Sequence, residues 1–229
     1  VHVLFLLLSH GPDGVEPSRQ THPIMSDSPY PEVGRPDFPA IEDRVLAVLA
    51  EKAAALDAII VLDQVHHLVT RRILDELPAL AGAHNIFLQG SSRQRLAEFH
   101  DFNLVIPNEQ EARGALGNLQ QDIAPGELAG KLRQEGSHRE VLLTLGPGGM
   151  AALGEDGEGA ALLPSLAAEV VDVTGAGDAV SSAVLLGRLA GWDLHSAAWV
   201  ASHCASIAIS RTGTHHVTLG ELQEALGGS

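Results

Sequence analysis

Residues 170–180, VVDVTGAGDAV, join an apolar segment to an alanine-rich segment that is typical of a helix. Gly175 and Gly177 lie between two aspartates, Asp172 and Asp178. Glycine lets a backbone turn sharply and bring its N–H groups close to a ligand. A helix N-terminus adds unpaired N–H groups and the positive end of a dipole, which suits an anion such as phosphate. The stretch therefore predicts an anion site at a helix start, where Asp178 either compensates the helix dipole or takes part in chemistry.

The composition excludes several classes of partner. The formal net charge is −15, which disfavours binding to nucleic acid or to an anionic membrane. Hydrophobic residues make up 45% of the 229 residues, enough for one domain with a large core. Cys204 is the single cysteine, so no disulfide can form within the chain. We therefore expect a cytoplasmic protein that has neither a nucleic-acid nor a membrane partner.

Helical and strand patterns alternate along the chain. Helices are predicted at 42–56, 68–82, 108–117, 125–136, 177–190, 194–210 and 219–226. Strands are predicted at 57–63, 85–89, 103–107 and 140–146, followed by a hairpin over 149–164. This alternation predicts an α/β fold in which helices cover a mostly parallel sheet, in a single domain over residues 1–229.

The first forty residues follow a different pattern. The opening VHVLFLLLSH predicts a buried parallel strand. A chain rarely opens on a core strand, so we expect the domain to be incomplete before Val1. Residues 11–40 are rich in glycine, proline and serine and predict a lid or a long irregular loop.

Two further motifs follow predicted strands, where parallel sheets bind ligands. In PNEQE (107–111), Asn108 and Glu111 either form a capping box or hold a hydrated Mg²⁺ ion through hard oxygen atoms. In LTLGPGG (143–149), Thr144 and the glycines either make a tight turn into the hairpin or contact nucleotide phosphates. The second motif lacks the Gly-Lys-Ser/Thr of a Walker loop.

The segment DVTGAGDAV (172–180) resembles the C-terminal signature of the PfkB, or ribokinase-like, carbohydrate kinases. The three motifs also resemble that family in order and spacing, and the resemblance covers residues 41–226. The Asp-Val-Thr variant and residues 91–112 resemble the branch of heptose-phosphate kinases and ADP-heptose synthases. The resemblance implies a three-layer α/β/α sandwich and ATP-dependent phosphoryl transfer to a hydroxyl of a sugar or sugar phosphate. We also expect that the chain can form a homodimer.

The resemblance implies a role for each residue of the signature. Asp178 would be the general base that takes the proton of the sugar hydroxyl. The amides of Gly175, Ala176, Gly177 and Asp178 would form an anion hole for the transferring phosphoryl group.

The resemblance also implies sites for ATP, Mg²⁺ and a monovalent cation such as K⁺. Asn108 and Glu111 would place Mg²⁺ through water. Asp172 and backbone carbonyls near 207–214 would hold the monovalent cation. The expected nucleotide contacts are Thr144, Gly146, Gly149 and, on the adenine side, His203.

Departures from the family pattern motivate a second hypothesis. No glycine-rich sugar-binding segment precedes residue 60, and Ser91-Ser92-Arg93 stands where relatives carry an acidic residue. A truncated or degenerate relative that binds nucleotide or sugar without efficient turnover is therefore the alternative to an active kinase. A Rossmann dehydrogenase is a poor third hypothesis, because no Gly-x-Gly-x-x-Gly follows an early strand.

Overall fold

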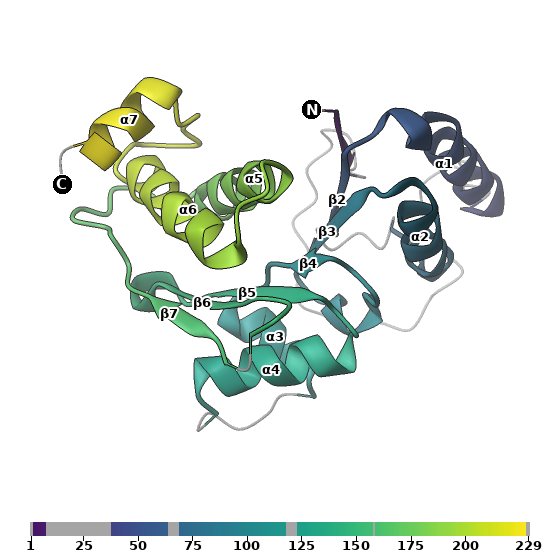
Figure 1. Cartoon of the computed structure of the whole chain (residues 1–229), viewed down its shortest axis with the longest axis horizontal. Helices are drawn as coiled ribbons and strands as arrows, with labels where there is room; N and C mark the ends of the chain where they lie inside the picture. Colours follow the sequence, from purple (N-terminus) through teal and green to yellow (C-terminus); the bar gives the residue numbers. More distant parts are fainter. Residues whose placement is uncertain (1, 8–37, 64–68, 118–122, 158, 228–229) are drawn as a thin grey trace, which may run out of the picture.

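A twisted sheet lies at the centre of the computed structural model, which describes residues 2–7, 38–63, 69–117, 123–157 and 159–227 (Figure 1). Within these ranges the sheet has seven strands in chain order, and β1 to β5 are parallel while β6 and β7 are antiparallel. The strands are β1 (Val3–Leu7), β2 (Ala58–Asp63), β3 (Phe87–Ser92), β4 (Leu104–Val105), β5 (Glu140–Thr144), β6 (Met150–Leu153) and β7 (Ala161–Leu163). The mostly parallel sheet predicted from the sequence is confirmed.

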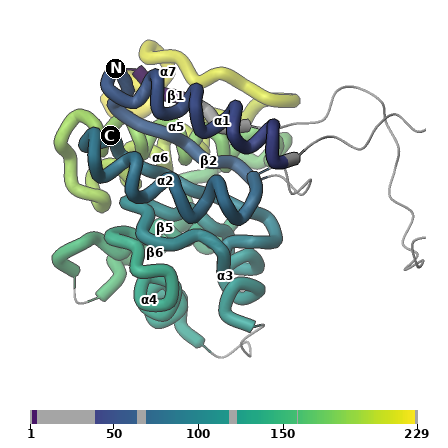
Figure 2. Tube along the Cα trace, turned by 90° about the vertical axis from the view of Figure 1, so that its right-hand side faces the viewer, coloured from purple at the N-terminus to yellow at the C-terminus, as the bar shows by residue number. Residues whose placement is uncertain are grey.

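Helices cover both faces of this sheet (Figures 1 and 2). One face carries α1 (Phe38–Lys52), α2 (Arg71–His84), α3 (Glu109–Ala115) and α4 (Pro125–Glu135). The opposite face carries α5 (Ala176–Leu189) and α6 (Leu194–Ile209), and α7 (Leu219–Gly227) packs beside α6. The three-layer α/β/α sandwich is thereby confirmed.

The alternation of side chains along β2 shows why both faces are apolar. Ile59 and Val61 belong to the core shared with α1 and α2, whereas Ala58 and Ile60 contact Leu185 of α5. Successive residues of a strand point to opposite faces, so a strand buried on both sides must be apolar throughout. This explains why DAIIVLD forms an unbroken apolar run before its final aspartate.

The boundaries of two helices differ from the prediction. Helix α1 begins at Phe38, inside the segment 11–40 predicted as a loop, and residues 11–37 of that segment lie outside the described residues. Helix α2 begins later than predicted because Thr70 caps it and accepts a hydrogen bond from the Ile73 N–H at 3.4 Å.

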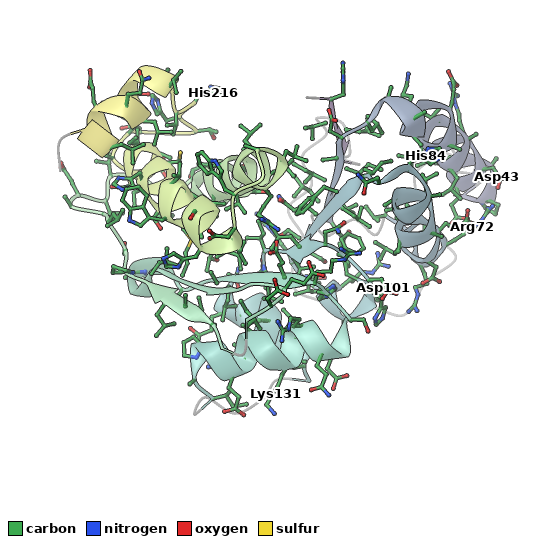
Figure 3. The ribbon with its side chains drawn as sticks, viewed as in Figure 1. Asp43, Arg72, His84, Asp101, Lys131 and His216 are labelled. Carbon is green, nitrogen blue, oxygen red and sulfur yellow. The ribbon has the colours of Figure 1, made fainter. Side chains whose placement is uncertain are left out.

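Helices α1 and α2 also meet at the surface, where Arg72 and Asp43 point toward one another at 2.6 Å (Figure 3). Such exposed ion pairs stabilise a fold only slightly.

A buried ion pair fixes the far end of α5. The Arg188 guanidinium donates to Oε2 of Glu140 at 2.8 Å, and it also donates to the backbone carbonyl of Trp192. The Glu140 side chain is only 5% exposed. Burial raises the pKa of Glu140, and the positive charge of Arg188 opposes that shift. The pair therefore links the start of β5 to the last turn of α5.

None of the helices in the described ranges combines the length and the apolar character that crossing a bilayer requires.

His138 makes stability depend on pH. Its side chain is buried, its ring packs edge-on against Phe102, and its Nδ1 atom has no hydrogen-bond partner among the described residues. Burial, followed by the charge of His100, lowers the pKa of His138 from 6.5 to about 4. The folded state therefore favours the neutral ring. Stability is full above pH 6.5, where the ring is neutral in both states, and it falls as the pH drops toward 4, because the unfolded state binds the proton first.

We expect the unfolding free energy of the wild type to fall relative to that of His138→Leu by up to about 3 kcal/mol over this range. Urea titrations of both proteins between pH 7 and pH 4 measure the difference. Parallel pH dependence in the two proteins would contradict this role of the buried ring.

Candidate active site

The motifs PNEQE (107–111) and LTLGPGG (143–149) meet at the carboxyl ends of β4 and β5. Asn108 and Thr144 form a parallel bridge, and the Thr144 N–H donates to the Pro107 carbonyl at 2.9 Å. The Thr144 hydroxyl points to the same carbonyl at 3.4 Å. Two polar side chains that are far apart in sequence therefore lie at one edge of the sheet.

Asn108 and Glu111 form the capping box that the sequence allowed. Oδ1 of Asn108 accepts from the Glu111 N–H at 2.8 Å, and Oε2 of Glu111 accepts from the Asn108 N–H at 2.9 Å. Burial raises the pKa of Glu111, and the hydrogen bond from the Asn108 N–H, followed by the nearby charge of Arg93, opposes that rise. The cap uses only one of the two Glu111 oxygens, so capping and contact with a hydrated cation are compatible.

The loop after β5 forms the tight turn that the sequence also allowed, and it leads directly into β6. Gly149 adopts a φ of 85°, and a Cβ atom there would lie 2.0 Å from the carbonyl oxygen of Leu163. Only glycine fits this position, because the neighbouring atom is backbone and cannot rotate away. The turn thus lets the chain after Thr144 pass close to β7.

Helix α5 begins without a side-chain cap. Gly175 has a φ of 83° and immediately precedes the helix, and no side-chain hydrogen bond caps it. The Ala176 N–H donates to the Val173 carbonyl at 3.3 Å, so this amide already has a partner. The amides of Gly177 and Asp178 follow in the first turn, where a helix supplies no acceptor of its own.

Asp178 is exposed at this helix start. Its carboxylate makes no hydrogen bond or ion pair with any residue in the described part of the chain, so it does not cap the helix. A carboxylate that is neither paired nor buried is available to a ligand.

Two cavities border the first turn of α5. A cavity of about 460 Å³ brings together the motifs LTLGPGG and DVTGAGDAV. It is lined by Thr144, Gly146, Gly149, Ala176 and Gly177. Ser206 and Ile209 of α6 also line this cavity. A second cavity of about 650 Å³ is lined by Gly175 and Asp178, by side chains of α5, α6 and α7, and by residues 214–218, which include His215 and His216. Asn108 and Glu111 line neither cavity and lie beside Thr144.

Asp172 joins the loop before α5 to the chain that follows α6. Its carboxylate accepts from the N–H groups of Thr174 and Gly213, both at 2.9 Å. These two bonds, that from Thr174 first, lower the pKa of Asp172. The described residues contain no group of three or more His, Cys, Asp or Glu side chains that could hold a metal ion. A cation at Asp172 would therefore need backbone carbonyls as further ligands.

His203 does not join the other nucleotide candidates. Its ring packs against Trp199 with the centroids 4.6 Å apart, and the residues of α6 that line the smaller cavity include Ser202, Ser206 and Ile209 instead. His203 is not among the residues that line this cavity, and its contact with the adenine side stays a prediction from the sequence.

A buried carboxylate that our sequence analysis did not single out lies at the same edge of the sheet. Asp63 ends β2, and its Oδ2 accepts from the hydroxyl of Ser92, which ends β3, at 2.8 Å. Both side chains are almost fully buried. The segment Ser91-Ser92-Arg93 lacks an acidic residue, yet a neighbouring strand places one beside Ser92. The available signal was an aspartate directly after an apolar strand pattern, the same kind of signal that identified Asn108.

Comparisons with known proteins identify the family and the fold. A model of the pfkB family of carbohydrate kinases matches residues 61–219. The bifunctional protein HldE of Nitrosococcus oceani is 35% identical over 130 residues, which are 57% of this chain and 27% of that protein. HldE of Geotalea uraniireducens is 29% identical over 188 residues, or 81% of this chain and 38% of that protein.

Among solved structures, phosphofructokinase-2 of Escherichia coli in complex with potassium matches with a TM-score of 0.68 at 18% identity, covering 83% of this chain and 61% of that one. The chain thus spans less than two thirds of each of these three proteins.

Proposed function

This chain belongs to the pfkB family of carbohydrate kinases, and on that premise we propose that it transfers the γ-phosphoryl group of ATP to a hydroxyl of a sugar or sugar phosphate. The observation that carries the proposal is the first turn of α5. Ala176 and Gly177 border the cavity that Thr144 and Gly149 also line, and the unpaired Asp178 borders the neighbouring cavity. Donor and acceptor could therefore approach one helix start from two sides.

The proposed chemistry uses this helix start in two ways. The N–H groups of Gly177 and Asp178, with Gly175 and Ala176 shaping the turn, stabilise the charge of the phosphoryl group in transfer. The Asp178 carboxylate accepts the proton of the acceptor hydroxyl. At the same time the hydroxyl oxygen bonds to the γ-phosphorus, and the bond between that phosphorus and the oxygen of ADP breaks. Because the carboxylate has no partner in the described residues, it can reach the hydroxyl without breaking an ion pair.

The donors at the sheet edge fit a nucleotide with Mg²⁺. Glu111 and Asn108 offer hard oxygen atoms, and Thr144, which forms a bridge with Asn108, lines the smaller cavity. When bound, Mg²⁺ would neutralise phosphate charge. We also propose that Asp172, with backbone carbonyls near 207–214, holds a monovalent cation. The low pKa of Asp172 keeps its charge available for that purpose.

The acceptor we propose is a phosphorylated or furanose-type sugar. This rests on the Asp-Val-Thr variant and on the similarity to HldE, an analogy at the level of the family.

The second candidate function is binding of nucleotide or sugar without efficient turnover. The lack of an acidic residue in Ser91-Ser92-Arg93 favours this candidate. The cytoplasmic location and the homodimer remain predictions from the sequence.

We expect ATP to bind in a Mg²⁺-dependent manner, because the cavity at Thr144 and Gly149 lies beside the oxygen donors of Asn108 and Glu111. Calorimetric titration with ATP, with and without Mg²⁺, measures this. Gly149→Val, whose side chain would collide with the backbone at Leu163, is expected to abolish binding in a protein that is also less stable. Absence of both heat and a thermal shift at millimolar ATP and Mg²⁺ would contradict the proposed nucleotide site.

A further inference from the structure

Gln89 is a polar residue in an apolar layer. It lies in the middle of β3, where its neighbours across the sheet are Ile60 and Leu104, and it is 1% exposed. Both neighbours belong to the cores that the sheet shares with α5 and α6. The neighbouring side chains on this face of the sheet are apolar, and an apolar side chain at position 89 would pack equally well among them. Packing alone therefore does not account for a glutamine here.

The Gln89 side chain holds α5. Its Nε2 atom donates to the hydroxyl of Ser181 at 2.6 Å and to the Ser181 carbonyl at 3.2 Å. Its Oε1 atom is buried and has no hydrogen-bond partner among the described residues. A buried acceptor without a partner is costly. The contact with Ser181 therefore comes with a buried acceptor that an apolar residue at this position would not have.

Ser181 lies one turn beyond the proposed anion hole. In an α-helix its N–H donates to the Gly177 carbonyl, and Asp178 is three residues before it on an adjoining part of the helix surface. Other contacts of α5 with the sheet come from Val180, Val184 and Leu185, which are apolar and without directional preference. Hydrogen bonds are directional, so the bond to Gln89 restrains rotation of the helix about its axis.

We infer that Gln89 is a positioning residue, which holds the first turns of α5 in the rotation that directs Asp178 and the amides of Gly177 and Asp178 at their ligands. The inference builds on the proposed function. The Glu140–Arg188 pair fixes the opposite end of the same helix. Together the two anchors restrain rotation and sliding of α5 on its apolar face.

Gln89→Met removes the carboxamide and keeps the length and volume of the side chain. Leu104→Met, a change of similar size on the neighbouring strand, is the control. We expect amide hydrogen exchange over residues 176–184 to quicken by about 3- to 10-fold in Gln89→Met and to stay unchanged in Leu104→Met, because one net hydrogen bond is worth a factor of this order. The thermal midpoint of Gln89→Met should stay within about 4 °C of the wild type.

Turnover gives the second readout. We expect kcat of Gln89→Met to fall about tenfold while KM for ATP stays within a few-fold, a split that a purely structural residue would not produce. Ser181→Ala should move exchange and kcat in the same direction. Unchanged exchange over 176–184 in Gln89→Met would overturn the inference, whether or not the wild type is active. A wild type without turnover would count against the proposed kinase, and the exchange result would still decide the role of Gln89.

Discussion

Replacing Asp178 with asparagine is expected to reduce turnover by about 10²- to 10⁴-fold, the usual contribution of a general base. The amide has nearly the size of the carboxylate and cannot accept the proton of the acceptor hydroxyl. Because the Asp178 side chain caps no helix and pairs with no described residue, stability should change by about 0.5 kcal/mol or less. ATP affinity should stay within a few-fold, since the amides of the first turn remain.

Asp193 provides a matched control for this substitution. It caps α6, where its carboxylate accepts from the Ser196 N–H at 2.8 Å and from the Ser196 hydroxyl at 3.0 Å. We expect Asp193→Ala to lower the unfolding free energy by about 1 kcal/mol and to leave turnover unchanged. Steady-state rates, calorimetric ATP affinity and urea titrations separate the two patterns. Near-normal turnover of Asp178→Asn would refute its role as the base.

The largest effect on stability is expected for Arg188→Met. The substitution leaves the Glu140 carboxylate buried at the start of β5 without its cation. Removing one partner of a buried ion pair costs about 3–5 kcal/mol, because the remaining charge is neither solvated nor neutralised. The variant also loses the bond to the Trp192 carbonyl, which joins the end of α5 to the turn before α6. Urea unfolding at pH 7 measures the loss.

The double variant Glu140→Leu/Arg188→Met distinguishes the unpaired charge from lost packing. An apolar pair of similar volume often replaces a buried ion pair at little cost, so the double variant should recover most of the stability lost by Arg188→Met. If the double variant is as unstable as the single one, the effect comes from packing and not from the charge on Glu140. A loss below about 1 kcal/mol in Arg188→Met would show that the pair is effectively solvated.

The sheet and its helices could be predicted because their signals are local. Apolar runs such as DAIIVLD and helical periods are set by burial on one or two faces, and the structure confirms the elements they indicate. The start of α1 at Phe38 was missed because the proline-rich composition before it outweighed a short helical pattern. The motifs at Asn108, Thr144 and Gly175 could be recognised because each directly follows a strand or precedes a helix.

Contacts between distant segments could not be predicted in the same way. Asp63 meets Ser92 only because β2 and β3 are neighbours in register, and Gln89 meets Ser181 across 92 positions of sequence. Whether His203 faces a nucleotide depends likewise on the rotation of α6, and its role stays a prediction from the sequence. These features depend on strand order and helix rotation, which a single sequence does not specify.

The most direct test of the central claim follows the phosphoryl group itself. The wild type is incubated with γ-labelled ATP, Mg²⁺ and a panel of free and phosphorylated sugars, and the label is then located after separation. We expect the label in a sugar product, with phosphorylated or furanose-type acceptors preferred, and at least about 100-fold less label with Asp178→Asn. Nucleotide binding with no label in any sugar would contradict the kinase and support the binding protein. Equal labelling by wild type and Asp178→Asn would contradict the proposed base.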